Sequence, residues 1–190
     1  MRVLVTGGCG FIGSNFIRYI LQHYNPASVT NVDALTYAGN LANLDGVVEE
    51  YGERYEFFQA DIAQADQIDT LLHEEQFFAV INFAAESHVD RSINDPQNFI
   101  HTNIVGTSVL LDAARRHGVK RFLQVSTDEF YGSLGDTGRF TYQSPLEPIS
   151  PYSASKASSD LLALACHHTF GLELVVTPRS TNYSPFPLPA

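Results

Sequence analysis

The sequence predicts a doubly wound α/β fold, with helices on both faces of a parallel sheet. Three observations predict it: short apolar runs alternate with amphipathic helical segments, a glycine-rich turn joins the first run to the first helix, and neither a repeat nor a linker divides the 190 residues. Because crossovers between parallel strands are right-handed, this alternation brings the carboxyl ends of the strands to one edge of the sheet. The length suits one domain with its own core.

Each expected element follows from periodicity and from the residues at its ends. Short runs rich in β-branched and aromatic residues predict strands at 2–6, 29–32, 55–60, 77–83 and 119–126. Helical periodicity predicts helices from 11 to about 24, from 64 to about 74, from 96 to about 117 and from 151 to 170, with a loop or short helix at 34–43. The expected end signals are Pro96 and Pro151 in first turns, Ser150 as an N-cap and Gly118 as a helix end.

Composition excludes several classes of partner. The chain has 11 Lys and Arg against 21 Asp and Glu, a net charge of -10 that opposes nonspecific binding to nucleic acid or an anionic membrane. Cys9 and Cys166 form neither a metal-ligand spacing nor a disulfide framework, so we expect no metal site and a reducing, cytoplasmic setting. Met1 leads directly into a strand, and no apolar run approaches the roughly 18 residues of a membrane span.

The glycine-rich turn predicts a phosphate site. Gly7, Gly10 and Gly13 follow the first strand and enter the first helix with the spacing G-x-x-G-x-x-G. In a strand–turn–helix unit such glycines allow the tight turn, the approach of backbone to a pyrophosphate and close packing of helix on strand. The helix N-terminus adds free N–H groups and partial positive charge. A glycine-rich turn without a ligand is the simpler alternative, and the surrounding pattern favours a dinucleotide.

Acidic residues after the second and third strands indicate where the adenosine half would lie. Asp33 follows the turn by about 20 residues and ends a strand, so its carboxylate can accept hydrogen bonds from both ribose hydroxyls and repel a 2′-phosphate. This favours NAD over NADP. A helix or turn cap is the alternative role. Asp61 and Ile62 would lie near the adenine, although Asp61 could equally cap the next helix.

Polar groups after the fourth and fifth strands indicate the reactive end. The small residues Ala84 and Ala85 permit a ligand to approach, and the polar residues 86–92 beyond them face the same crevice, with His88 expected to be an ordinary loop residue. The fifth strand ends in Ser126-Thr127-Asp128-Glu129. Two carboxyl groups beside a hydroxyl can serve as acid and base if their surroundings separate their pKa values. A solvated acidic loop is the alternative.

A tyrosine and a lysine four residues apart complete the predicted chemistry. Tyr152 and Lys156 share one face of the helix that begins at 151. The ammonium group favours the phenolate, as does an oxidised nicotinamide ring, so the tyrosine can act as a base near neutral pH. The lysine can also hold the nicotinamide ribose. A Tyr-x-x-x-Lys pair by itself occurs often by chance. Together with the glycine turn and the hydroxyl after the fifth strand, it is a strong indication of this chemistry.

Together these stretches resemble the extended short-chain dehydrogenases/reductases, and most closely the dehydratases of that superfamily that act on dTDP-glucose. The resemblance covers nearly the whole chain, and its carrying stretches are residues 6–15, 35–40, 84–93, 127–129 and 152–156. It implies a Rossmann fold and NAD. Sugar-nucleotide epimerases share the glycine turn and the Tyr/Lys pair, whereas the adjoining Asp128-Glu129 is typical of the dehydratases.

The resemblance implies dehydration of dTDP-glucose to dTDP-4-keto-6-deoxyglucose, with tightly bound NAD as an internal hydride carrier. Tyr152 would take the proton of the sugar 4-hydroxyl, with Thr127 hydrogen-bonded at that oxygen. Glu129, initially ionised, would remove the C5 proton, and Asp128, initially protonated, would protonate the departing 6-hydroxyl. Lys156 would orient the ribose. The implied cofactor contacts are Gly7, Gly10, Phe11, Ile12, Gly13, Asp33, Asp61, Ile62, Ala84, Ala85, Ser126, Tyr152 and Lys156, and the implied substrate contacts are Ser87, Thr127 and Asn182.

The last residues depart from the pattern of the family. We expect residues 1–178 to form the NAD-binding domain and 179–190 to begin a substrate-binding region that is largely missing. Four of the nine prolines fall between 178 and 190, which predicts an extended or turning segment. The family segment Ser-Asn-Asn-Tyr-Gly-Pro matches residues 180–185 without a gap, which puts Thr181 in place of an asparagine that contacts the substrate diphosphate; a gap starting at Arg179 gives that role to Asn182.

Two other functions remain open at this point. One is a nucleotide-sugar epimerase or another extended short-chain oxidoreductase. The other is a truncated, non-catalytic domain that binds NAD or pairs with a partner. Because enzymes of the family pair through the helices that correspond to 96–117 and 151–170, we expect a homodimer.

Overall fold

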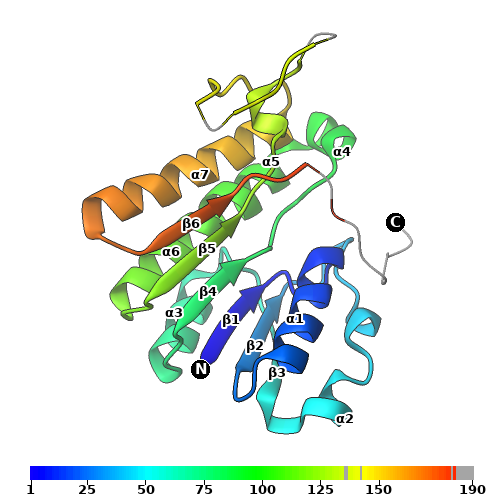
Figure 1. Ribbon diagram of the computed structural model, residues 1–190, viewed down its shortest axis with the longest axis vertical. Coiled ribbons are helices and arrows are strands. Elements are labelled where there is room, and N and C mark those ends of the chain that lie inside the picture. Colours follow the sequence, from blue (N-terminus) through cyan, green and yellow to red (C-terminus); the bar gives the residue numbers. More distant parts are fainter. Residues whose placement is uncertain (135–136, 142, 181, 183–190) are drawn as a thin grey trace.

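Six strands form one parallel sheet in this computed structural model, which describes residues 1–134, 137–141, 143–180 and 182 (Figure 1). Its strand order is β3-β2-β1-β4-β5-β6. The strands are β1 (Arg2–Thr6), β2 (Ser28–Asp33), β3 (Tyr55–Gln59), β4 (Ala79–Asn82), β5 (Arg121–Val125) and β6 (Leu174–Thr177). The order reverses between β1 and β4, which opens a crevice at their carboxyl ends. The predicted doubly wound fold is confirmed.

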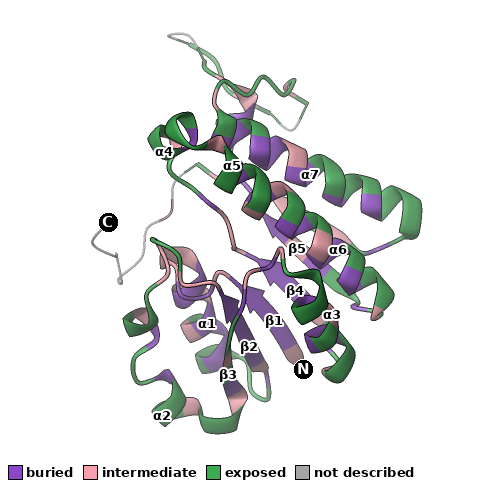
Figure 2. Cartoon of the chain, turned by 180° about the vertical axis from the view of Figure 1, so that it is seen from behind, coloured by how far each residue is buried: buried purple, intermediate pink, exposed green. Residues whose placement is uncertain are grey.

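Helices cover the sheet on both faces. On one face lie α1 (Phe11–His23) and α2 (Val47–Tyr51), and on the other α3 (Ala65–Glu74), α6 (Thr107–Arg116) and α7 (Pro151–Phe170) (Figures 1 and 2). Side chains alternate along β1. Val3 and Val5 join the core under α1, whereas Leu4 joins the core on the opposite face of the sheet, under α3, α6 and α7. No helix of the described chain is long and apolar enough to cross a membrane.

Glycines allow the junction of β1 and α1 to pack tightly. Gly7 has a φ of +70°, a conformation that favours glycine. A Cβ on Gly13 would lie 2.3 Å from the carbonyl oxygen of Gly7 and 2.8 Å from the Cα of Gly8. The first turn of α1 therefore rests directly on the turn that precedes it, as predicted for the third glycine.

The end signals predicted for the 151–170 helix are confirmed. Ser150 accepts a hydrogen bond from the backbone N–H of Ser153, whose hydroxyl in turn accepts one from the backbone N–H of Ser150. Pro151 is the first helical residue, and Gly171, with a φ of +76°, follows the last. These signals fix where α7 begins, and so fix the first two turns that carry Tyr152 and Lys156.

The long helix predicted from 96 to about 117 is confirmed, but its middle is not α-helical. The helical run consists of α5 (Pro96–Phe99), a π-helical segment (Ile100–Gly106) and α6, without a break between them. Within the π-helical segment, the amide of Asn103 bonds the backbone N–H and C=O of Glu86 at 2.9 and 3.0 Å and the Ser155 hydroxyl at 2.8 Å. The widened turn admits these contacts, and apolar periodicity cannot reveal it.

Short elements account for the other differences. Two short helices were not expected: α2, with five residues, and α4 (Val89–Asn94), with six. Neither is long enough to show an apolar period. A 3₁₀ turn (Leu41–Leu44) matches the loop or short helix expected at 34–43, and others lie at Gly52–Arg54 and Glu129–Tyr131. Strands β4 and β5 begin two residues later and end one residue earlier than expected.

We expect Gly13→Ala to lower the free energy of unfolding by at least about 2 kcal/mol, because the new methyl group overlaps the backbone of Gly7 and Gly8. Gly10→Ala is the matched control in the same turn: its Cβ would lie 3.3 Å from the nearest atom, so its cost should stay below about 1 kcal/mol. Urea unfolding of both variants measures the difference. Equal losses would contradict the tight contact between α1 and the turn.

Candidate functional site

A cleft of about 670 Å³ lies at the carboxyl edge of the sheet, where the strand order reverses. The loops after β1, β2, β3, β4 and β5 line it together with α7. All the residues predicted to contact the cofactor are among its lining residues, and so is Ser87, whereas Thr127, Asp128, Glu129 and Asn182 are not. One cleft thus unites residues spread over most of the chain.

The N-terminus of α1 opens onto the cleft. Its N-cap is Gly10, no side chain of the described residues caps the helix, and its first turn contains no acidic residue. The first N–H groups of a helix have no partner within the helix, and the helix dipole adds partial positive charge. The glycine turn therefore offers the cleft a site suited to an anion such as a phosphate.

Asp33 ends β2 and ties two loops together. Its carboxylate accepts hydrogen bonds from the backbone N–H groups of Cys9 and Leu35, both at 2.8 Å. Burial raises the pKa of Asp33, and these two bonds oppose that rise. The alternative role as a turn cap is therefore realised in the structure. Each carboxylate oxygen can accept a further bond, so a ribose remains a suitable partner.

Asp61 does not cap the helix that follows it, because the N-cap of α3 is Gln64. One carboxylate oxygen accepts the N–H of Ala63 at 2.9 Å, and the other lies 3.0 Å from Nε2 of His101. The neighbouring Ile62 is buried at the wall of the cleft. The pair thus forms a fixed turn at the β3 end of the site.

The predicted pair on α7 lies against the end of β5. Burial raises the pKa of Tyr152, and the nearby Thr127 hydroxyl and the charge of Arg179 lower it. Lys156 is 5% exposed and donates to the carbonyl oxygen of Val125 at 2.7 Å, and burial lowers its pKa to about 8. Both side chains reach the cleft from one helix face, as the spacing predicts.

Asp128 and Glu129 lie beyond the cleft. The backbone N–H of Asp128 donates to the carbonyl oxygen of Arg179 at 3.0 Å, which fixes the loop beside the segment that follows β6. The side chain of Glu129 is exposed, and burial of part of it, together with the Asp128 carboxylate, raises its pKa. The raised pKa strengthens Glu129 as a base.

Three residues that the motif analysis did not assign join the loops after β2 and β4. The hydroxyl of Tyr37 lies 2.8 Å from Nδ1 of His88 and 3.2 Å from the hydroxyl of Ser87, and the Arg91 guanidinium stacks 3.9 Å from the centre of the Tyr37 ring. All four residues line the cleft. His88, expected to be an ordinary loop residue, thus helps to connect the two loops.

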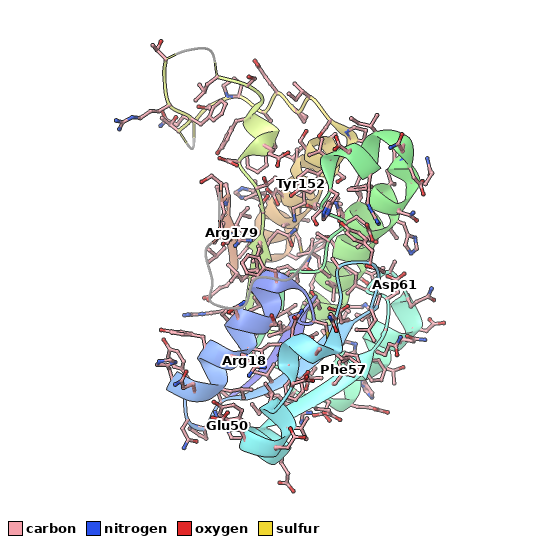
Figure 3. The ribbon with its side chains drawn as sticks, turned by 90° about the vertical axis from the view of Figure 1, so that its right-hand side faces the viewer. Arg18, Glu50, Phe57, Asp61, Tyr152 and Arg179 are labelled. Atoms are coloured by element: carbon pink, nitrogen blue, oxygen red, sulfur yellow. The ribbon has the colours of Figure 1, made fainter. Side chains whose placement is uncertain are left out.

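Arg179 was also missed as a site residue. It lines the cleft, and its charge lowers the pKa of both Tyr152 and Lys156 (Figure 3). Its guanidinium donates to the side-chain oxygen of Asn182, which lies outside the cleft lining. The structure does not describe Thr181 or residues 183–190. The choice between the two alignments of residues 180–185 with the family segment therefore lies outside the described residues.

The model of one protein family, described as GDP-mannose 4,6 dehydratase, matches residues 4–188. The chain belongs to this family. It is 51% identical to the dTDP-glucose 4,6-dehydratase of Xanthomonas campestris pv. campestris (strain B100), over 98% of this chain and 54% of that protein. The chain thus spans about half the length of such relatives. The resemblance drawn from the motifs is confirmed.

Solved structures agree with this assignment. DesIV, a dTDP-glucose 4,6-dehydratase from Streptomyces venezuelae solved with NAD and TYD bound, superposes with a TM-score of 0.91 at 49% identity, covering 97% of this chain and 57% of that one. A UDP-glucose 4-epimerase from Thermus thermophilus, solved in complex with NAD, superposes with a TM-score of 0.83 at 31% identity, covering 93% and 54%. The dehydratase is more similar to this chain than the epimerase is, both in TM-score and in sequence identity.

We expect Asn103→Ala to lower the free energy of unfolding by about 3 kcal/mol, because it leaves the buried N–H and C=O of Glu86 without their partner. Asn98→Ala is the control: its amide is exposed and bonds the exposed Asp95, so a loss under about 0.5 kcal/mol is expected. Hydrogen exchange at the Glu86 amide should accelerate in the Asn103 variant alone. Unchanged exchange there would show that Asn103 does not hold the β4 loop.

Proposed function

We propose that this chain forms the NAD-binding and catalytic part of a dTDP-glucose 4,6-dehydratase, which converts dTDP-glucose to dTDP-4-keto-6-deoxyglucose. The observation that carries the proposal is that Tyr152 and Lys156 line a cleft that begins at an uncapped helix N-terminus, while Lys156 is hydrogen-bonded to the end of β5, directly before Thr127, Asp128 and Glu129. The names of the chain's relatives support this reading.

The lining of the cleft fits NAD along its whole length. The turn at Gly7, Gly10 and Gly13 would hold the pyrophosphate, Asp33 the adenosine ribose, and Asp61 with Ile62 the adenine. Tyr152 and Lys156 would hold the nicotinamide ribose. Ala84, Ala85 and Ser126 complete that end of the cleft. Bound NAD supplies an acceptor for a hydride that it returns within the same cycle.

The side chains divide the proton transfers among themselves. Tyr152 accepts the proton of the sugar 4-hydroxyl. The positive charge of Arg179 favours the phenolate form of Tyr152, and a charged Lys156 one helical turn away would favour it further. Thr127 hydrogen-bonds at the same sugar oxygen. Glu129 removes the C5 proton and Asp128 protonates the departing 6-hydroxyl. Ser87 and Asn182 would contact the substrate.

A second candidate is that this part of the protein binds NAD, or pairs with a partner, without turning over a sugar. It is supported by the cleft lining, which contains all the proposed cofactor contacts but not Thr127, Asp128 or Glu129. The epimerase alternative is weaker, because it does not account for two adjacent carboxyl groups beyond Thr127. We keep residues 1–178 as the proposed cofactor domain and 179–190 as the proposed start of the substrate-binding region.

We also propose a homodimer in the cytoplasm. Large apolar side chains are exposed on the helices expected to pair, namely Ile100 and Val105 in the π-helical segment and Leu161, Leu162 and Leu164 in α7. Contact between two copies would remove this apolar surface from water. The two cysteines are free and buried, which suits a reducing compartment.

We expect the chain to bind NAD and to reject NADP, and Asp33→Asn to weaken NAD binding about tenfold or more. The substitution removes a carboxylate charge, so the ratio of the NADP to the NAD dissociation constant should fall. Calorimetric titration of both cofactors gives this ratio. A loss of the same size for both cofactors would mean that Asp33 acts only by holding the backbone of Cys9 and Leu35.

Glu129→Gln, placed in the protein that contains this chain, should abolish formation of the 4-keto-6-deoxy sugar yet leave formation of NADH detectable by its absorbance. The amide cannot take the C5 proton, whereas Tyr152 is unchanged. Glu147→Gln, at another exposed glutamate, should remain active. In deuterated water the active proteins should yield a product with deuterium at C5, and a product without it would exclude the proposed elimination.

A further inference from the structure

Helix α7 presents a row of three polar residues, at intervals of four, to the end of β5. Thr127 is near enough to Tyr152 to lower the pKa of the phenol, Lys156 donates to the carbonyl oxygen of Val125 at 2.7 Å, and Asp160 accepts the hydroxyl of Ser126 at 2.5 Å. Residues four apart lie on one face of a helix, so the row follows consecutive turns. The proposed chemistry uses the first two members and leaves the third without a role.

Asp160 is a buried acid whose bonds leave it incompletely satisfied. Its side chain is 6% exposed, and in the described part of the chain its Oδ1 has no hydrogen-bond partner. Burial raises the pKa of Asp160 to about 6, while the Ser126 bond and the charge of Lys156 lower it. A buried, half-bonded carboxylate costs free energy unless a cation lies nearby. Lys156 is the cation that acts on it.

Two charged groups act on Lys156, and they oppose one another. Burial lowers the pKa of Lys156, Asp160 raises it, and Arg179 lowers it. The Val125 carbonyl accepts one of its three N–H bonds. Of these groups only Asp160, one turn further along the same helix, brings negative charge.

We propose that Asp160 is a positioning residue of this site, which keeps the buried ammonium group of Lys156 charged and holds the Ser126 hydroxyl proton away from the cleft. The consequence for Tyr152 rests on the proposed function, in which a charged Lys156 adds to the effect of Arg179 in favouring the phenolate. The consequence for Ser126 is geometric. Ser126 lines the cleft and its hydroxyl proton is donated to Asp160, which leaves its oxygen free to act as an acceptor for a donor group of a bound ligand.

The sequence makes a direct test convenient, because Lys120 and Lys156 are its only lysines. Lysine labelled with carbon-13 at Cε gives two NMR signals, with exposed Lys120 as the internal reference and Lys120→Arg as the assignment variant. We expect Lys156 to titrate at about 8, with a smaller step near 6 from Asp160. In Asp160→Asn the smaller step should vanish and the proton affinity of Lys156 should fall at least tenfold.

Matched variants separate this role from a structural one. Asp160→Glu should restore much of the proton affinity of Lys156, whereas Asp112→Asn, which removes a carboxylate paired with Arg115 and Arg116 on α6, should leave it unchanged. An unchanged Lys156 titration in folded Asp160→Asn overturns the proposal.

Two further measurements do not depend on whether Asp160→Asn folds. A wild-type Lys156 signal that shows no second step below its own titration contradicts the proposal by itself. In Ser126→Ala that step should move to higher pH, because a bond that lowers the pKa of Asp160 is lost; a step that stays in place contradicts the Ser126 part. Calorimetric titration with NAD tests the proposed function independently. Failure to bind NAD would reject the proposed function, but the effect of Asp160 on the titration of Lys156 would be unaffected.

Discussion

The close packing of α1 on the turn after β1 is the constraint on which the rest of the site depends. The backbone of Gly7 lies against Ala84 after β4, where a Cβ would come within 2.5 Å of the Ala84 nitrogen. The backbone of Cys9 is bonded by Asp33 after β2. The turn therefore sets the distance between the loops of three neighbouring strands, and only glycine at 7 and 13 permits that distance. A helix N-terminus aimed into the cleft follows from this packing.

What could be predicted from the sequence is what local spacing determines. Tyr152 and Lys156 share a face because helices have a fixed period, Ser150 and Pro151 begin α7 by local bonds, and Asp33 ends β2 because the apolar run stops there. The alternation of short apolar runs with helical segments predicted the parallel sheet. A parallel sheet in turn places the carboxyl ends of its strands at one edge.

What could not be predicted depends on contacts between distant residues. The π-helical segment exists where Asn103 reaches Glu86, 17 residues away, and no period of apolar residues records that bond. Tyr37 meets His88 across 51 residues. Arg179 acts on Tyr152 only because β6 lies beside β5. In each case the residue types are ordinary for a loop or a helix, so their role appears only once the fold brings them together.

Burial of charge explains why the row on α7 is costly. The pKa of Lys156, about 8, lies below its ordinary value of 10.5, so its contribution to stability rises as the pH increases from about 8 toward that value. The pKa of Asp160, about 6, lies above its ordinary value of 3.8, so its contribution falls as the pH increases between those values. Both groups are charged between about 6 and 8, where the combined cost is greatest. A fold keeps such a cost where the charges have a use.

The two halves of the proposed reaction differ in their surroundings. Tyr152 and Lys156 are buried, and Lys156 is already hydrogen-bonded, so the proposed oxidation of the sugar meets a site that is preorganised by the chain itself. Glu129 is exposed, and water around it screens its electrostatic interactions with neighbouring groups. Elimination needs one of Asp128 and Glu129 ionised and the other protonated. The sugar, or further protein surface over it, must therefore exclude water from this pair before the second half of the reaction can proceed.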